Sequence, residues 1–419
     1  MVKVGYKQTE IGVIPEDWEI LSLNSIVVND GLIRGPFGGS LKKEYFVNNG
    51  YKVYEQRNAI YKTTDIGNYF INAEKFLELK RFEINGDDFI VSCSGTIGKI
   101  FQIPRNAPKG VINQALLKIK LDNKKIDNYY FLSIFNSTKF QAQIIDNSHG
   151  GAMPNLVGMD TFRKILIPIP PKEEQKAIAN ALSDVDALIT SLEKLIAKKE
   201  SIKTATMQQL LIGKKRLNGF SGKWEEKKLG DIASFYKGKG LPKSQLSIDG
   251  KYKCIHYGEL FTTYKEIVSN IQSFTNYCDN TIVSTKNDIL MPTSDVTPNG
   301  LATASCTQED GIILGGDILI IRPNNNILDG RFFAFYISID KNQIMQLISG
   351  STVYHLYGSD MAKFVLNVPP TIEEQQAIAQ ILTDMDNEIE TLKTKLSKTK
   401  AMKDGMMSEL LSGKTRLKV

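Results

Sequence analysis

The chain has 419 residues, of which 42% are hydrophobic and 23% charged, and its net charge is +6. This composition is typical of globular domains and excludes disordered and fibrous proteins, while the length predicts two or three domains. The small positive charge allows a polyanionic partner but does not require one.

The sequence shows no segment that would direct the chain to a membrane or to an oxidising compartment. The N-terminus lacks an apolar run, and the longest apolar-rich stretch, residues 311–321, is interrupted by Gly315, Gly316 and Asp317. We therefore expect neither a signal peptide nor a membrane span, and a cytoplasmic location. The cysteines are far apart and form no CxxC pair, which predicts no disulfide framework and no zinc site: Cys93, Cys254, Cys278 and Cys306.

The first predicted domain covers residues 1–168 and mixes short strands with short helices. β-rich runs such as residues 88–92 and 111–119 are separated by turn dipeptides such as Asn49-Gly50 and Asn85-Gly86. An aromatic run, Tyr129-Tyr-Phe-Leu, predicts a short core helix. These features predict a compact α+β domain.

A long helix follows within a predicted spacer at residues 169–217. Pro170-Pro171 excludes helix before it, and Glu173-Glu174 would lie in its first turn, where carboxylates favour the helix dipole. Apolar residues then recur at alternating steps of four and three, which indicates a coiled-coil seam. Gly213 is suited to a left-handed helix cap.

The second half of the chain repeats this organisation, with a second α+β domain at residues 218–367 and a second spacer at 368–419. Residues 173–217 and 373–417 align without gaps and share 20 of 45 residues. Upstream, Trp18-Glu19 is matched by Trp224-Glu225. The chain is therefore a duplication of one unit.

The two helices are predicted to pair with each other. The predicted seam residues are Ile178, Leu182, Val185, Ile189, Leu192 and Ile196 in the first copy, and Ile378, Leu382, Met385, Ile389, Leu392 and Leu396 in the second. Antiparallel pairing would give the molecule a pseudo-twofold axis, although an intermolecular coiled coil would use the same stripe. The pattern then slips, so we expect a local change of packing where the seam requires apolar residues but the sequence has Lys199, Lys203, Thr399 and Lys403.

Motifs for catalysis are not found. Ser412-Gly413-Lys414-Thr415 resembles the end of a phosphate-binding loop, but Ser408 stands where the first glycine is required. No GxSxG, HExxH or GxGxxG sequence occurs, and the histidines stand singly. We therefore expect no catalytic residue, no metal site and no cofactor in this chain. Two similar domains joined by a rigid spacer suit an extended ligand such as duplex DNA.

Several motifs together resemble the specificity (S) subunit of type I restriction-modification systems over the full length. They are the Ile167–Ala179 segment, the Leu-Leu-x-Gly-Lys-x-Arg-Leu helix ends, the Tyr6–Trp18 segment, the Gly35–Leu41 loop and the Ser94–Gly98 turn. The resemblance implies two target-recognition domains that read the halves of a split DNA sequence, and an antiparallel coiled coil that spaces them. It also implies docking of two modification subunits, which bring S-adenosylmethionine and N6-adenine methylation, and of restriction subunits that use ATP and Mg²⁺.

The second copy departs from the first in two loops. Residues 351–356 differ from residues 151–156, and Pro292–Pro298 replaces the Ser94–Gly98 turn. Loop roles therefore transfer less directly to the second domain.

Candidate DNA contacts are chosen by side-chain chemistry within the loops that the resemblance indicates. Lys and Arg contact phosphates, whereas Arg, Lys, Asn and Gln can read base edges. The candidates are Arg34, Ser40, Lys42, Lys43, Gln56, Arg57 and Asn58 in the first domain, and Lys237, Lys239, Lys243, His256 and Tyr257 in the second. Each lysine could equally be an ordinary solvated surface residue. Arg57 is the strongest candidate for a base contact.

These observations predict a non-catalytic DNA-recognition subunit. Two other interpretations stay open from the sequence alone. One is a coiled-coil adaptor that holds proteins without reading DNA, and the other is a free-standing DNA-modifying enzyme, which would need a cofactor motif.

Overall fold

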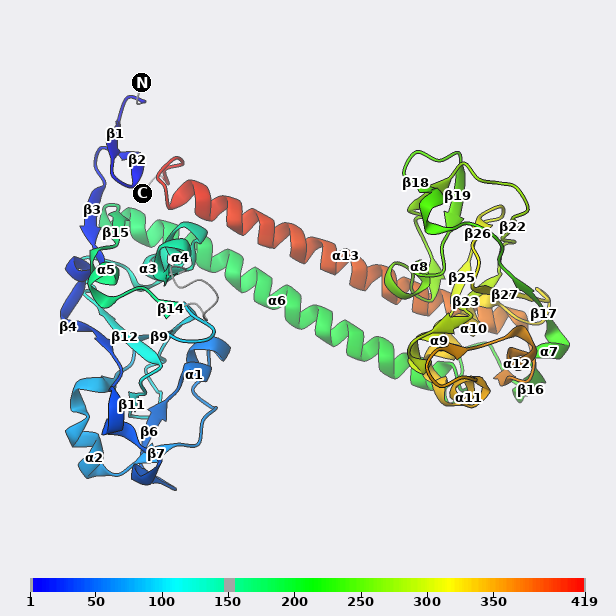
Figure 1. Ribbon diagram of the computed structural model, residues 1–419, viewed down its shortest axis with the longest axis horizontal. Helices are drawn as coiled ribbons and strands as arrows, with labels where there is room; N and C mark the ends of the chain where they lie inside the picture. Colours follow the sequence, from blue (N-terminus) through cyan, green and yellow to red (C-terminus); the bar gives the residue numbers. More distant parts are fainter. Residues whose placement is uncertain (1–2, 147–154, 418–419) are drawn as a thin grey trace. The chain divides into compact units, whose positions relative to one another are not determined.

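A computed structural model describes residues 3–146 and 155–417, and residues 151–154, compared above with the second copy, lie outside that part. Within it the chain forms two compact units. The first unit contains residues 1–191 and 396–419, and the second contains residues 192–395. Each unit therefore consists of one mixed α/β domain together with part of each long helix (Figure 1).

The first unit contains a four-stranded sheet, a five-stranded sheet and three two-stranded sheets, with short helices around them (Figure 1). Its strands are β1 (Tyr6–Thr9), β2 (Gly12–Pro15), β3 (Glu19–Ser22), β4 (Val27–Arg34), β5 (Phe46–Val47), β6 (Tyr51–Tyr54), β7 (Phe70–Ile71), β8 (Glu83–Ile84), β9 (Phe89–Ser92), β10 (Ile100–Gln102), β11 (Gly110–Ile112), β12 (Leu116–Leu121), β13 (Ile145–Asp146), β14 (Asn155–Leu156) and β15 (Leu166–Ile169). Its short helices are α1 (Gln56–Tyr61), α2 (Ala73–Glu78), α3 (Asn128–Asn136), α4 (Thr138–Ile144) and α5 (Met159–Lys164).

The second unit has the same plan. Its strands are β16 (Glu225–Lys228), β17 (Ala233–Lys237), β18 (Leu246–Ser247), β19 (Tyr252–Ile255), β20 (Ile267–Val268), β21 (Ser273–Thr275), β22 (Ile282–Val283), β23 (Ile289–Pro292), β24 (Ser294–Asp295), β25 (Ser305–Thr307), β26 (Ile313–Leu314), β27 (Ile318–Pro323), β28 (Tyr354–His355) and β29 (Val365–Val368). Its short helices are α7 (Leu229–Ile232), α8 (Glu259–Thr262), α9 (Pro298–Leu301), α10 (Gly330–Ile339), α11 (Lys341–Leu347) and α12 (Gly358–Met361).

The sheet orders show that the duplication extends to topology. The order β4-β12-β9-β10 in the first unit corresponds to β17-β27-β23-β25 in the second, which β20 extends by one strand. The order β5-β7-β6-β11-β8 corresponds to β18-β21-β19-β26-β22. In both copies the strand after the tryptophan pairs with the strand before the long helix, as β3 with β15 and β16 with β29. Trp18 and Trp224 therefore precede equivalent strands, which explains the weak upstream match between the two copies.

The two long helices are α6 (Lys172–Leu210) and α13 (Ile372–Leu410), each of 39 residues. They run antiparallel within each unit. In the first unit Asp186 of α6 pairs with Lys403 of α13, and in the second unit Lys203 of α6 pairs with Asp386 of α13, each at 2.7 Å between nitrogen and oxygen. The predicted antiparallel coiled coil is thus the fold of this chain.

The helix ends and the apolar stripe follow from the sequence pattern. Gly213 and Gly413 adopt φ values of +68° and +70°, the left-handed conformation that favours glycine. The predicted seam residues are buried or half-buried. In the first unit the seam continues into the core of the α/β domain through Ile178 and Leu182, and in the second through Ile378 and Leu382.

The Glu-Glu-Gln motif at each helix start is explained by buried contacts rather than by the helix dipole alone. The Gln175 side chain accepts a hydrogen bond from the Asp127 backbone N–H and donates to Lys125 O, which fixes the start of α3. Gln375 makes the same contacts with Asp329 and Ile327 at the start of α10. Each motif therefore joins a long helix to its recognition domain.

Candidate DNA-recognition surfaces

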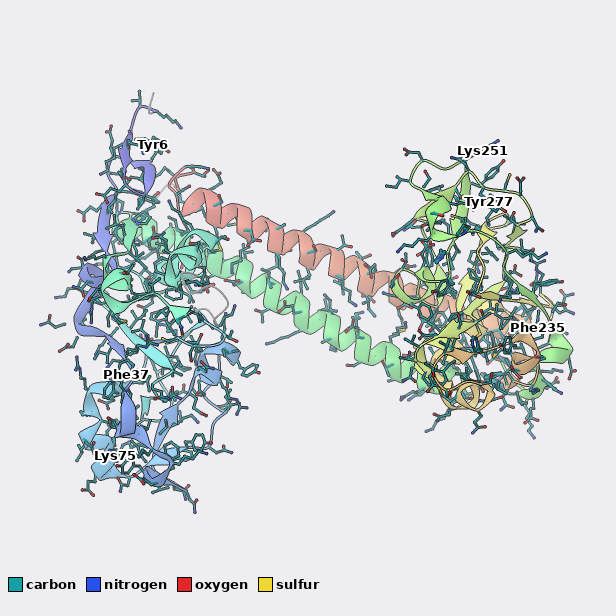
Figure 2. All side chains as sticks on the ribbon, viewed as in Figure 1. Tyr6, Phe37, Lys75, Phe235, Lys251 and Tyr277 are labelled. Carbon is teal, nitrogen blue, oxygen red and sulfur yellow. The ribbon has the colours of Figure 1, made fainter. Side chains whose placement is uncertain are left out.

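In the first domain, the loop that follows β4 is held close to the body of the domain. A Cβ added to Gly35 would lie 1.8 Å from the Asn113 carbonyl oxygen, so this position requires glycine. The Ser40 hydroxyl donates to the Phe37 carbonyl at 3.1 Å and closes the loop. Phe37 is 68% exposed, and the Arg34 guanidinium lies 5.7 Å from the centre of its ring (Figure 2).

Two other loops meet the end of β4. The position of a Cβ on Gly95 lies 3.9 Å from Gln56 Nε2, which places the start of α1 beside the Ser94–Gly98 turn. Burial raises the pKa of the Cys93 thiol to about 12, and the nearby positive charge of Arg34 opposes that shift. The loop after β4 and the turn after β9 both bond to the residues at the start of β12, through Gly35 N–H to Leu116 O and Cys93 N–H to Ala115 O. Arg34 Nε and Gln56 Oε1 are buried without a hydrogen-bond partner, so both have unused capacity.

The remaining candidates of the first domain differ in what they can contact. Arg57, Lys42 and Lys43 are exposed. Lys43 lines a small cavity of about 160 Å³ under the loop, together with Glu55, and Lys42 pairs with Glu44 at 3.6 Å.

Asn58 has a different role from the one predicted for it. Its side chain is fully buried and accepts from the Glu55 backbone N–H, and its amide donates to Thr63 O and Ile66 O. These bonds use its hydrogen-bonding groups to position the start of α1. We therefore assign Asn58 to support of Gln56 and Arg57 rather than to base reading.

In the second domain, the loop after β17 has the same backbone constraint. A Cβ on Gly238 would lie 2.0 Å from the Gly315 carbonyl oxygen, as for Gly35. Lys237, at the position of Arg34, pairs with Asp317 at 3.2 Å between exposed side chains. Lys239 and Lys243 are exposed.

Before α8, the second domain has the aromatic residues His256 and Tyr257 where the first domain has the polar residues Glu55 and Gln56. The His256 and Tyr257 ring centres are 4.9 Å apart, and Tyr257 packs edge-on against Phe261. The counterpart of Asn58 is Glu259, whose carboxylate accepts from the His256 backbone N–H at 2.7 Å. The two recognition surfaces therefore share a backbone plan but present different chemistry.

The turn after β23 also differs between the copies. Ser294 pairs with His355, as Ser94 pairs with Asn155 in the first domain. The His355 ring stacks on Tyr357, and Val296 in the adjoining loop is 72% exposed. The pairing explains why Pro292–Pro298 can replace the Ser94–Gly98 turn without changing the fold.

A second group of residues, which the sequence pattern did not single out, closes the end of each helix pair. In the first unit Glu174 is buried and accepts two hydrogen bonds from Arg416 and one from Trp18 Nε1 at 3.0 Å. Arg416 also binds Asp17 and lies over the Trp18 ring. We call this contact the first clasp.

The second clasp joins Arg216 to the buried Glu374 through two hydrogen bonds at 2.6 Å. Trp224 Nε1, the counterpart of the Trp18 donor, is buried without a partner. The sequence signal that could have indicated the clasps is repetition, because the Trp and the Gly-Lys-x-Arg helix end both recur in the two copies. The sequence spacing does not show that they meet.

Groups suited to metal binding are not assembled in the part of the chain that the structure describes. No set of three His, Cys, Asp or Glu residues among residues 3–146 and 155–417 could hold a metal ion. Burial raises the pKa of the Cys254 thiol to about 12 and that of Cys306 further. Among the described residues, no helix is both long and apolar enough to cross a membrane.

Comparison with known proteins agrees with this architecture. The profile of the family described as type I restriction modification DNA specificity domain matches residues 15–204 and 221–400. Two curated proteins of Methanocaldococcus jannaschii are similar along their whole length. The type I restriction enzyme MjaX specificity subunit is 26% identical, covering 99% of this chain and 97% of that protein, and the MjaVIII specificity subunit is 25% identical, covering 97% and 94%.

A solved structure has the same fold. The type I restriction-modification S subunit from M. genitalium aligns with a TM-score of 0.59 at 18% identity, over 94% of this chain and 96% of that chain. The family match covers both repeats and most of the chain. The chain therefore belongs to the type I restriction-modification specificity subunits, and it is a non-catalytic component with two DNA specificity domains.

Proposed function

We propose that this chain reads a bipartite duplex DNA target, with one half-site for each recognition domain and a fixed gap between them. The observation that carries the proposal is the repeated surface. In both domains a glycine-constrained loop after the first long strand, at Gly35 and Gly238, stands beside the start of a short helix. As proposed, the antiparallel helix pair acts as the spacer that keeps the two surfaces a constant distance apart along a duplex.

The first surface, as proposed, contributes Arg34, Gln56 and Arg57 to base edges, with Lys42 and Lys43 near phosphates. Arg34 Nε and Gln56 Oε1 have no hydrogen-bond partner inside the protein, so neither side chain is fully committed to internal contacts. Ser40 shapes the loop through its bond to Phe37.

The second surface, as proposed, contributes His256 and Tyr257 to bases and Lys239 and Lys243 to phosphates. Lys237 is already paired with Asp317, so its contribution to DNA binding is expected to be smaller. Aromatic and apolar groups such as Tyr257 and Val296 suit contact with thymine methyl groups. We therefore expect the two half-sites to differ in base preference.

We further propose that the chain assembles with two modification subunits that carry the N6-adenine methylation, and with restriction subunits. The helix pair and the two clasps offer a repeated surface on which two copies of one partner could dock. S-adenosylmethionine, ATP and Mg²⁺ would bind to those partners.

The test is co-expression with a candidate modification subunit, followed by sequencing of N6-methyladenine in the host DNA. A split motif with a constant gap is the expected result, whereas methylation at a single continuous motif would contradict the bipartite reading. Failure of the assembled complex to bind duplex DNA would favour the coiled-coil adaptor.

Removal of one equivalent turn from both α6 and α13 tests the role of the helices as a spacer. The gap should change while both half-sites stay the same. Altered half-sites with an unaltered gap would contradict this role.

A further inference from the structure

The apolar seam of the helix pair contains a Lys–Asp layer in each unit. Lys203 and Lys403 occupy equivalent positions in the repeat, and each pairs with an aspartate of the other helix at 2.7 Å, Asp386 and Asp186 respectively. All of these side chains are at least partly buried, with Lys203 the most buried at 14% exposure. The lysines that interrupt the predicted stripe are therefore used between the helices.

In the first unit the recognition domain reaches into this layer. The Tyr129 hydroxyl, on α3, donates to Asp186 Oδ2 at 2.5 Å. Burial and then the neighbouring Asp186 carboxylate raise the pKa of Tyr129, so the hydroxyl keeps its proton and stays a donor. We call Tyr129, Asp186 and Lys403 the first junction, because they connect the recognition domain, α6 and α13.

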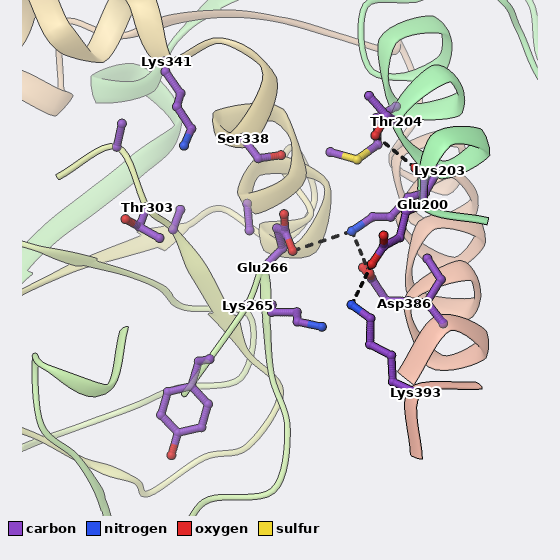
Figure 3. Close-up of a pocket in the computed structure, with 16 residues that line it drawn as sticks. Glu200, Lys203, Thr204, Lys265, Glu266, Thr303, Ser338, Lys341, Asp386 and Lys393 are labelled. Atoms are coloured by element: carbon purple, nitrogen blue, oxygen red, sulfur yellow. Dashed lines mark hydrogen bonds and ion pairs between the residues drawn. The ribbon is translucent and has the colours of Figure 1, made fainter. Parts of the chain in front are cut away.

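In the second unit a different residue makes the connection. Lys203 Nζ lies 3.9 Å from Glu266, which precedes β20, and 5.3 Å from the centre of the Phe335 ring of α10. A cleft of about 460 Å³ opens here between the recognition domain and the helices (Figure 3). The Lys203 side chain reaches from α6 to Glu266 along this cleft, and we call Lys203, Asp386 and Glu266 the second junction.

The junctions also define how the helices are aligned. Asp186 and Lys203 are 17 residues apart on α6, and Asp386 and Lys403 are 17 residues apart on α13, so both ion pairs follow the same antiparallel register. A shift by one heptad towards the start of α6 would place Lys403 against the buried Ala179 and leave Asp186 without this lysine. A polar residue in an apolar seam typically fixes register in this way, often at some cost in stability.

We propose that the two junctions hold each recognition domain at one position on the helix pair, and thereby set how strictly the complex requires its native half-site gap. This inference rests on the bipartite reading proposed above. Tyr129 and Glu266 are then positioning residues: they contact no DNA, but they transmit the helix register to the recognition surfaces.

The first experiment uses Tyr129→Phe in the complex with its modification subunit. Methylation rates are compared on duplexes with the native gap and with gaps one base pair longer or shorter. The preference for the native gap should fall by about tenfold, within the usual range of coupling between two sites, while both half-sites keep their base preference.

Tyr51→Phe is the matched control, because it removes a hydroxyl in the same domain from a ring that packs against Phe76. It should leave the gap preference unchanged. An equal loss of preference in Tyr51→Phe would mean that the effect is general destabilisation, and would overturn the proposal.

The second experiment uses Lys203→Met and Glu266→Gln, with Lys198→Met as the control at an exposed position of α6. Lys203→Met should relax the gap preference more than Glu266→Gln, because it removes the helix–helix contact as well. Glu266→Gln changes no helix residue, so it stays informative if Lys203→Met fails to assemble.

The outcomes separate this inference from the proposed function. A wild-type complex that methylates no bipartite motif contradicts the proposed function itself. A wild-type complex that requires its native gap, with Tyr129→Phe and Glu266→Gln variants that require it equally, contradicts the junctions alone.

Discussion

The two clasps are built from the same repeated residues and yet are not equally satisfied. Glu174 receives hydrogen bonds from Arg416 and Trp18, and Arg416 is also held by Asp17. In the second clasp Lys223 occupies the position of Asp17, and Arg216 is instead held by the backbone carbonyl of Ser221. A duplicated sequence therefore conserves the ion pair, while its surroundings diverge.

The recognition surfaces differ more strongly than the clasps. Arg34, Gln56 and Arg57 of the first surface correspond to Lys237, Tyr257 and Gly258 of the second. The glycine-constrained loops are retained because backbone atoms approach each other there. The side chains that face outward are free to change, which is the property that a protein with two different half-sites needs.

The largest effect is expected from breaking a clasp. Arg416→Met leaves the buried Glu174 carboxylate without its cation and should lower the free energy of unfolding by about 3 kcal/mol. Arg216→Met should cost somewhat less, because Arg416→Met also breaks the ion pair between Arg416 and Asp17. Urea unfolding followed by tryptophan fluorescence measures both, since Trp18 belongs to the first clasp and Trp224 lies beside Gly213, near Arg216 in the sequence.

A cation-to-methionine change at a neighbouring exposed position is the control for this test. Lys414→Met, at an exposed neighbour of Arg416, should change stability by less than about 0.5 kcal/mol. Equal losses for Lys414→Met and Arg416→Met would show that the clasp is not the source of the effect.

The next effect concerns the recognition surfaces. Arg57→Ala should weaken discrimination in the first half-site by roughly 1–3 kcal/mol. The second half-site should be unchanged, because the second domain has Gly258 at the position of Arg57 and therefore reads its bases without this cation. Affinities for duplexes with single changes in either half-site measure this. The control is Arg105→Ala, whose side chain is 86% exposed and paired with Asp87.

The salt dependence decides the type of contact. Uniform weakening across all sequences with a smaller salt slope would make Arg57 a phosphate contact instead of a base contact.

A smaller effect separates the two tryptophans. Trp18→Phe removes a hydrogen bond to a buried carboxylate and should cost about 1–2 kcal/mol more than Trp224→Phe, whose indole N–H has no partner to lose. Trp18 is fully buried whereas Trp224 is half-buried, so part of the difference also reflects the larger cavity left at Trp18. Equal unfolding free energies would contradict the asymmetry of the clasps.

The smallest effect is a pH dependence that only the first clasp should show. The hydrogen bond from Arg416 lowers the pKa of Asp17 below its usual 3.8. Its contribution is therefore complete above the unfolded pKa and is lost as the pH falls through the folded value.

Asp17 is largely exposed, so the contribution should be a few tenths of a kcal/mol. The urea midpoint of Asp17→Asn should lie below that of wild type at pH 7, and the two should converge as the pH is lowered below about 4. A constant difference down to pH 3 would contradict the assignment.

Much of the fold could be predicted because its signals are local or periodic. The proline pairs, the apolar stripe and Gly213 and Gly413 define both long helices, and the repeat predicts their pairing. The candidate surfaces were found partly by motif. Asn58 was misjudged, since side-chain chemistry alone does not distinguish an amide that reads a base from one that caps a buried helix start.

The sequence by itself determined that the chain is a duplication with two α+β domains, two long helices and no catalytic motif, because periodicity and repetition are visible along one dimension. Only the tertiary structure decided that Lys203 and Lys403 pair with aspartates across the seam, that Arg216 and Arg416 reach buried glutamates about 160 and 240 residues away, and that Gln56 lies beside the Ser94–Gly98 turn. The reason is physical. A buried charge is tolerated only opposite its partner, and chain topology, which sequence spacing does not show, determines which residues become opposite.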